Sequence, residues 1–172
     1  MKILIVSDTH GRCYYLEKTL ARVKPIDLLI HLGDFEGDEA YIKAIADCPI
    51  EMVSGNNDFF SSLPRENFIQ IGKYYIMMTH GHRYGVNSGV AHLKEVARCE
   101  GADIVLFGHT HVPMIDLSDD KIYAINPGSI TQPRQAGRVP TFIIMEIDRK
   151  GEAHFTLNYI GDDLFEDDSV NY

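Results

Sequence analysis

The sequence predicts a single mixed α/β domain, and three observations point to that class. The chain has 172 residues, which is long enough to bury one sizeable core. Its first half alternates short β-branched runs with helical periodicity, and connections this short imply parallel strands joined by right-handed crossovers. Its last third has the pattern of antiparallel hairpins. No internal repeat, low-complexity segment or linker divides the sequence.

The first half contains five expected elements in alternation. Its opening run is apolar and β-branched and ends at Asp8, as a buried strand would. Leu16, Leu20 and Val23 then have the spacing of one helical face, and Pro25 marks the end of that helix. The same reasoning predicts strands at 2–7, 27–32 and 50–54, and helices at 13–23 and 38–47.

The second half changes character. Two strands separated by a Gly-Lys turn are expected at 67–71 and 74–79. A helix at about 88–100 leads into a short apolar strand at 104–107. The rest is hairpin-like, with strands expected at 114–117, 121–125, 140–147 and 153–160. We assign residues 1–160 to the domain and 161–172 to an acidic C-terminal tail that is expected to be frayed.

Charge and cysteine content exclude several classes of protein. The formal net charge of −9 repels polyanions, so a nucleic-acid partner is not expected. The apolar runs are too short for a transmembrane helix or a signal peptide, so a cytoplasmic protein without membrane contact is expected. Cys13, Cys48 and Cys99 form no C-x-x-C pair, which argues against a zinc ribbon or a disulfide framework, and we expect all three to be buried.

Five predicted strands end in residues that can bind a metal ion. Ligands of open α/β sheets bind beyond the carboxyl ends of the strands, so these residues are expected on one rim of the sheet. Where two of them are separated by one residue, an extended backbone would point both side chains the same way. Glycines at 33, 55, 81 and 108 leave room for converging loops and permit positive φ. The candidate ligands are Asp8, His10, Asp34, Asn56, His80, His109 and His111.

The number of candidates favours two metal ions. Seven ligands are too many for one site of ordinary coordination number, whereas a bridging Asp34 would give each ion four protein ligands and leave room for a shared water. Two divalent ions beside two carboxylates leave positive charge for a hydroxide and a phosphate oxygen. The four imidazoles favour Mn, our first expectation, and also Fe, Ni, Co or Zn, over Mg.

Five short motifs carry a family resemblance. In order, SDTHG, LGD, GNND, THGH and GHTH resemble the signature blocks of the calcineurin-like metallophosphoesterase superfamily. The short length and the NPGS motif at 126–129 resemble its YfcE-like phosphodiesterase branch. The resemblance implies a four-layer αββα sandwich, two sheets flanked by helices, with a binuclear metal centre. It assigns one ion to Asp8, His10 and His111 and the other to Asn56, His80 and His109, with Asp34 bridging.

One position departs from the family pattern. Many members carry a histidine after the Gly-Asn, where it contacts phosphate and helps the leaving group. Asn57 stands there in this chain and cannot donate a proton at physiological pH, so diesters with acidic leaving groups should tolerate the change best. His82 is the candidate replacement, which makes Asn57 and His82 the candidate catalytic residues. Arg134, together with Arg138, is a candidate for steering phosphate.

The function that we expect is hydrolysis of small phosphodiesters by a metal-bridging hydroxide. A phosphomonoesterase or a nuclease is the alternative at the same site, and a homo-oligomer is an open question. A second alternative is a protein-interaction scaffold, because the fold also resembles a retromer subunit with a degraded metal site. The pair Phe59–Phe60 would flank a base or aryl group, or else lie in the core or in a dimer contact.

Overall fold

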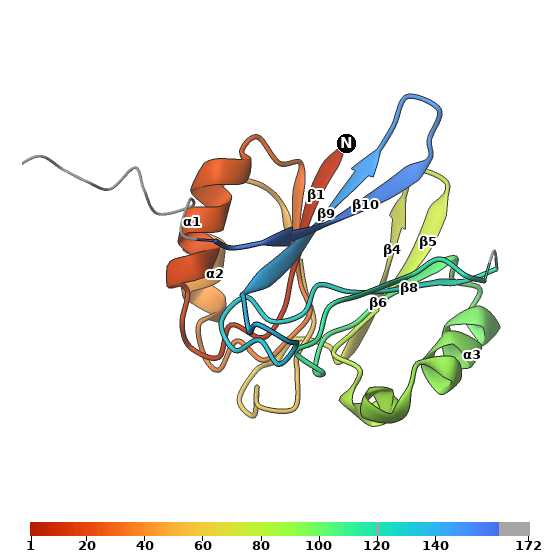
Figure 1. Ribbon diagram of the computed structural model, residues 1–172, viewed down its shortest axis with the longest axis horizontal. Coiled ribbons are helices and arrows are strands. Elements are labelled where there is room, and N and C mark those ends of the chain that lie inside the picture. Colours follow the sequence, from red (N-terminus) through yellow and green to blue (C-terminus); the bar gives the residue numbers. More distant parts are fainter. Residues whose placement is uncertain (120, 162–172) are drawn as a thin grey trace, which may run out of the picture.

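A computed structural model describes residues 1–119 and 121–161, which form two five-stranded sheets (Figure 1). The first sheet contains, in spatial order, β10 (Ala153–Tyr159), β9 (Thr141–Ile147), β1 (Lys2–Val6), β2 (Leu28–His31) and β3 (Ile50–Met52). The second contains β4 (Glu66–Ile71), β5 (Tyr74–Thr79), β6 (Ile104–Leu106), β8 (Tyr123–Asn126) and β7 (Met114–Asp116).

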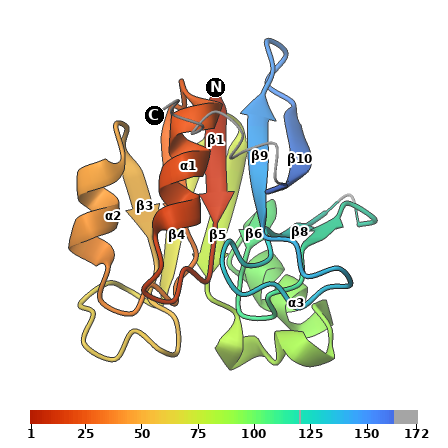
Figure 2. The ribbon, with the colours of Figure 1, turned by 60° about the vertical axis from the view of Figure 1, so that its left-hand side comes forward.

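Helices cover the outer face of each sheet. Two of them, α1 (Tyr14–Val23) and α2 (Glu39–Ile45), lie on the first sheet, and α3 (Ala91–Cys99) lies on the second (Figure 2). The four-layer αββα sandwich predicted from the sequence is confirmed. Among the described residues, no helix has the length and apolar character needed to cross a membrane.

Both sheets are mixed, as the two halves of the sequence predict. In the first sheet β1, β2 and β3 are parallel, and β9 and β10 are added as an antiparallel hairpin. In the second sheet β5, β6 and β8 are parallel, and β4 and β7 pair antiparallel at its edges. The parallel strands of each sheet therefore send their carboxyl ends toward one side of the molecule.

The packing of β1 explains its uninterrupted apolar sequence. Ile3 and Ile5 point into the core between the two sheets, whereas Leu4 and Val6 pack toward α1 and α2. A strand buried on both faces has no polar side to alternate with. The period of two therefore separates two apolar layers instead of an inside from an outside.

Three expectations differ from the structure or fall outside it. The helix expected at 88–100 is divided into a 3-10 turn, Val86–Ser88, and α3, because Gly89 has a φ of +131° between them. Cys13 is buried and Cys48 half-buried, but Cys99 is exposed in the last turn of α3, so that expectation was wrong. Residues 162–172 of the expected acidic tail lie outside the described residues, and the boundary after residue 160 stays a prediction.

Candidate metal centre

The seven candidate ligands lie at the carboxyl ends of five parallel strands. Asp8 and His10 follow β1, Asp34 follows β2, and Asn56 follows β3, all in the first sheet, whereas His80 follows β5 and His109 and His111 follow β6 in the second. The expectation of one rim of one sheet was therefore wrong, because the cluster lies where the rims of two packed sheets meet. Contacts between loops of the two sheets fix this junction: the N–H of His109 donates to Asp8 Oδ2 at 3.2 Å, and His80 Nδ1 lies 2.7 Å from Leu32 O.

The backbone at these residues is not extended. Asp8, His10, Asp34, His109 and His111 all have positive φ, between 47° and 68°. Residues other than glycine adopt this region at a cost, and such strain gathers at functional sites. The expected extended spacing of the two pairs was thus wrong. The side chains converge because each loop turns through a left-handed conformation.

Ring nitrogens and carboxylate oxygens face one another across the cluster. His111 Nε2 is 3.1 Å from both Asp8 Oδ1 and His10 Nε2. Asp34 Oδ2 lies between the two halves of the cluster, 4.0 Å from His10 Nε2 and 3.4 Å from His80 Nε2. In each of two groups of three residues, the ligand atoms all lie within 4.8 Å of one another. The groups are Asp8, His10 and His111, and Asp8, Asp34 and His80.

The outer nitrogen of three imidazoles is held by an acceptor. His10 Nδ1 is 2.6 Å from Glu36 Oε1, His80 Nδ1 is 2.7 Å from Leu32 O, and His111 Nδ1 is 2.6 Å from Gln132 O. An acceptor at Nδ1 fixes the proton there and directs the lone pair of Nε2 inward, which is how metal-binding histidines are oriented.

His109 is oriented the other way around. Its Nε2 lies 3.1 Å from Asn87 Nδ2, which leaves Nδ1 for the cluster. A metal ion on Nδ1 would place the ring proton on Nε2, so the amide of Asn87 would have to present its oxygen as the acceptor. Neither Asn87 nor Glu36 was among the residues singled out in the sequence. Glu36 is two residues from Asp34, which is a usable signal, but nothing in the sequence pairs Asn87 with His109.

Several buried atoms of the cluster lack hydrogen bonds. Among the described residues, Asp8 Oδ1, Asn56 Oδ1 and His80 Nε2 have no hydrogen-bond partner. A buried polar atom left in this way costs about 1–3 kcal/mol, so native proteins rarely retain one without a reason. All three are electron-pair donors, and divalent cations bound in the cluster would satisfy them.

The buried carboxylates and imidazoles of the cluster shift one another's pKa values. Burial raises the pKa of Asp8, but the contact with His111 and the charge of His80 outweigh it and lower that pKa overall. The pKa of Asp34 is likewise lowered, against burial, by His80 and the N–H of Asn57. Burial lowers the pKa of His80, but Asp34 and Asp8 raise it overall. A metal ion would compete with a proton for Nε2 of His80.

Close packing leaves no room for side chains at three glycines of the cluster. A Cβ on Gly55 would collide with Asp34 Oδ1, and one on Gly108 would collide with Ser7 Oγ and lie 2.9 Å from Asp8 Oδ2. A Cβ on Gly33 would lie 2.6 Å from Gly55 N, and Gly33 and Gly81 also have positive φ. Both roles expected of these glycines are therefore present.

The NPGS segment supports the ligand loops through its side chains. Ser129 Oγ donates to Asp8 O at 2.8 Å, and Asn126 Nδ2 donates to Gly108 O at 2.9 Å. The N–H of Gly128 donates to Asn126 Oδ1 within the segment. The motif therefore buttresses the Asp8 and Gly108 loops.

Asn57 and Asp58 hold the loop that carries Asp34. The side-chain amide of Asn57 donates to Asp34 Oδ2 at 2.7 Å, and its N–H donates to Asp34 Oδ1 at 2.9 Å. The buried carboxylate of Asp58 accepts four backbone N–H groups. Oδ1 accepts those of Phe35 and Glu36 at 2.9 and 2.7 Å, and Oδ2 accepts those of Asp34 and Gly55 at 2.7 Å each.

The remaining candidates lie around the cluster. The ring of His82 is 5.6 Å from that of His80, and burial lowers the pKa of His82 to about 4, which leaves it neutral at physiological pH. The N–H of Arg134 donates to His111 O at 2.9 Å, but its side chain is exposed and touches no candidate ligand in the contacts found for the described residues. His31 is buried beside Thr9, as expected for a packed side chain near the site.

The comparisons with known proteins agree with this geometry. A family model described as the calcineurin-like phosphoesterase superfamily domain matches residues 1–150. The chain is 34% identical over 149 residues to the probable metallophosphoesterase YsnB of Bacillus subtilis, covering 86% of this chain and 85% of that protein. A crystal structure from Streptococcus pneumoniae, described as a predicted phosphoesterase, is 34% identical, with a TM-score of 0.78, and the match covers 94% of this chain and 90% of that one.

Two more distant structures share the fold. YfcE of E. coli, described as a phosphoesterase, is 21% identical with a TM-score of 0.65, over 94% of this chain and 100% of that one. Vps29 of Entamoeba histolytica, complexed with Zn²⁺, is 23% identical with a TM-score of 0.73, over 92% and 99%. At these identities the likeness concerns the sandwich itself.

Proposed function

The chain belongs to the calcineurin-like phosphoesterase superfamily, and we propose that it is a metal-dependent phosphodiesterase that hydrolyses small phosphodiesters. One observation carries the proposal: Asp8 Oδ1 and His80 Nε2, which lie 3.9 Å apart, and Asn56 Oδ1, in the loop after β3, are buried without hydrogen-bond partners among the described residues. All three are ligand atoms for a divalent cation.

The proposed ligand sets follow the two halves of the cluster. Asp8, His10 and His111, whose ligand atoms lie within 4.8 Å of one another, would hold the first ion. Asn56, His80 and His109 would hold the second, and Asp34 would bridge, which is supported by its position between His10 and His80. Four imidazoles favour Mn²⁺, or else Fe, Ni, Co or Zn. When bound, the two ions would supply the hydroxide nucleophile and stabilise charge on the phosphate.

The side chains around the cluster support a diester with an acidic leaving group. The amide of Asn57 is engaged with Asp34 and carries no acidic proton. His82, with its pKa lowered to about 4, is neutral at physiological pH and would hydrogen-bond the phosphate without protonating it. Departure of a poor leaving group would therefore lack assistance from both candidate residues, which disfavours simple alkyl monoesters.

Two other proposals follow from the sequence. The excess of negative charge disfavours nucleic-acid substrates. The guanidinium of Arg134 would steer phosphate from the exposed rim of the site. The cytoplasmic location and the oligomeric state stay predictions.

The test is hydrolysis of bis(p-nitrophenyl) phosphate by chelator-stripped protein titrated with Mn²⁺. We expect activity to appear with metal and to reach a plateau near two equivalents. His109→Ala should abolish turnover, whereas the control His154→Ala, which removes an exposed histidine on β10, should not. Comparison with p-nitrophenyl phosphate separates a diesterase from a monoesterase. No turnover by folded protein with Mn²⁺, Ni²⁺ or Zn²⁺ would refute the proposal and favour a scaffold of the same fold.

A further inference from the structure

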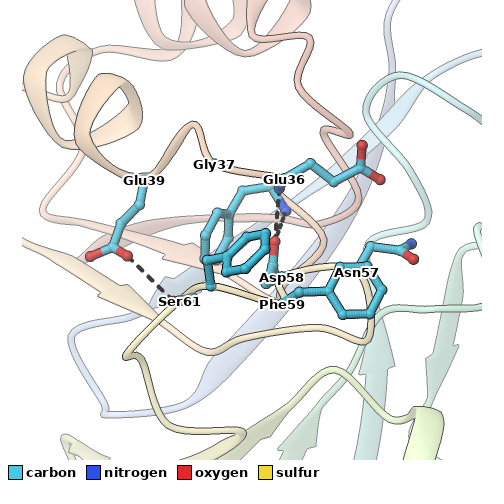
Figure 3. Close-up of a pocket in the computed structure, with 9 residues that line it drawn as sticks. Glu36, Gly37, Glu39, Asn57, Asp58, Phe59 and Ser61 are labelled. Carbon is cyan, nitrogen blue, oxygen red and sulfur yellow. Dashed lines mark hydrogen bonds between the residues drawn. The ribbon is translucent and has the colours of Figure 1, made fainter.

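A cavity of about 480 Å³ lies beside the candidate metal cluster, between the loops that follow β2 and β3 (Figure 3). Its walls include Glu36, Glu39, Asn57, Phe59 and Phe60. None of the seven candidate metal ligands lines it, so it is a separate compartment. Its volume is in the range of cavities that hold small organic groups.

The cavity and the metal cluster share a wall. Glu36 lines the cavity and contacts His10 through the 2.6 Å pair described above. Asn57 lines the cavity and donates to both carboxylate oxygens of Asp34. A phosphorus atom held at the cluster would therefore have this cavity within reach of one of its ester groups.

Two aromatic side chains stand exposed in the wall. Phe59 is 80% exposed and Phe60 is 102% exposed, so neither ring is buried by the residues that the structure describes. A packed core position, one of the readings of this pair, is thereby wrong. Their loop is nevertheless anchored, because the carboxylate of Asp58 accepts the four N–H groups described above. Exposed rings on a braced loop form a stacking surface with little entropy left to lose.

The charge of the wall restricts what can bind. The lining residues include three acids, Glu36, Glu39 and Asp58, and, in the part of the chain that the structure describes, no lysine or arginine. Figure 3 shows Glu39 at one end of the cavity and Asn57 at the other, with Phe59 toward Asn57. A second anionic group would be repelled, whereas an uncharged ring, or one bearing N–H donors, would meet acceptors and aromatic faces.

We propose that this cavity is a subsite for a planar, uncharged aromatic ester group of the phosphodiester, stacked on Phe59 and Phe60 while the phosphate lies at the metal cluster. The subsite rests on the proposed function, because it presupposes a phosphoester bound at the metal ions. It names the substrate class as aryl-type diesters over purely alkyl ones.

The test compares phenylphosphonate with methylphosphonate, which carry the same head group and a P–C bond that phosphoester hydrolysis does not cleave. Calorimetry on the Mn²⁺-loaded protein should show phenylphosphonate binding about tenfold or more tightly. In the double variant Phe59→Ala/Phe60→Ala, the preference for phenylphosphonate over methylphosphonate should fall below about threefold, and the affinity for methylphosphonate should be unchanged. Both rings are exposed, so the variant should fold. Leu117→Ala, which removes an exposed apolar side chain beyond β7, should keep the wild-type ratio.

Three outcomes would overturn the subsite. Equal affinities in the wild type would show that the cavity takes no ring. An unchanged ratio of the two phosphonate affinities in the double variant would show that the two phenylalanines do not contact the phenyl ring. If, in addition, ultracentrifugation showed that the double variant had lost a dimer, the pair would be assigned to self-association. Failure of the wild type both to bind either phosphonate and to hydrolyse bis(p-nitrophenyl) phosphate would refute the proposed function as well.

Discussion

Asp58→Asn should strongly destabilise the fold. The carboxylate is buried, and each of its oxygens accepts two backbone N–H groups. Asparagine retains one oxygen and replaces the other with an NH₂ group. That group would face two N–H donors, either those of Phe35 and Glu36 or those of Asp34 and Gly55.

The magnitude follows from the two N–H groups that lose their acceptor. Each buried donor left unpaired costs about 1–3 kcal/mol, so the free energy of unfolding should fall by about 2–6 kcal/mol. In a chain of this size each kcal/mol lowers Tm by about 2–4 °C, so the decrease should be about 4–24 °C.

The assay is urea unfolding followed by circular dichroism, in chelator, because metal bound only to the folded state would add stability. Asp148→Asn is the control. Its carboxylate also accepts two backbone N–H groups, those of Lys150 and Glu152, but in an exposed turn where water replaces a lost acceptor. We expect the control to shift the urea midpoint far less than Asp58→Asn does. An Asp58→Asn variant within about 1 kcal/mol of the wild type would refute the reasoning.

Three further predictions concern the cluster and its surroundings. The Cβ of Gly108→Ala would press on the Asp8 loop, so this variant should lower the free energy of unfolding by about 1–3 kcal/mol and weaken Mn²⁺ binding. An unchanged affinity for Mn²⁺, measured by calorimetry, would contradict the packing argument. Asn87→Leu should weaken Mn²⁺ binding about 10- to 100-fold by releasing His109, with the unfolding midpoint in chelator little changed. Burial lowers the pKa of His31 from 6.5 to about 4. Between these two pH values His31 takes up a proton in the unfolded chain but not in the folded one, so the free energy of unfolding falls as the pH is lowered from 6.5 to about 4. In His31→Gln the free energy of unfolding should fall by about 3 kcal/mol less between pH 7 and pH 4 than in the wild type. An unchanged dependence of the free energy of unfolding on pH would contradict this prediction.

Periodicity predicted the elements because the core is regular. The apolar run before Asp8 and the helical spacing of Leu16 and Leu20 gave β1 and α1 within a residue or so of their observed bounds. Strand ends predicted the convergence of the metal-binding residue types, since Asp34, Asn56 and His80 each follow a parallel strand.

Other features depend on tertiary placement that a linear pattern does not contain. The left-handed backbone at Asp8 and His109 is set by the turn of each loop, whereas spacing alone favoured an extended one. The contact of Asn87 with His109 joins two loops of the second sheet. The residues at the strand ends are the same whether the strands form one sheet or two. The sequence therefore does not reveal which sheet rims meet at the cluster.

The positive φ angles at five candidate ligands bear on what a substitution would do there. At each of these positions glycine would relieve backbone strain, and at Asp8 and Asp34 it would also remove a buried charge. Glycine at any one of these positions would therefore exchange a ligand-type side chain for a less strained backbone. The chain thus carries aspartate or histidine at five positions where the backbone conformation alone favours glycine.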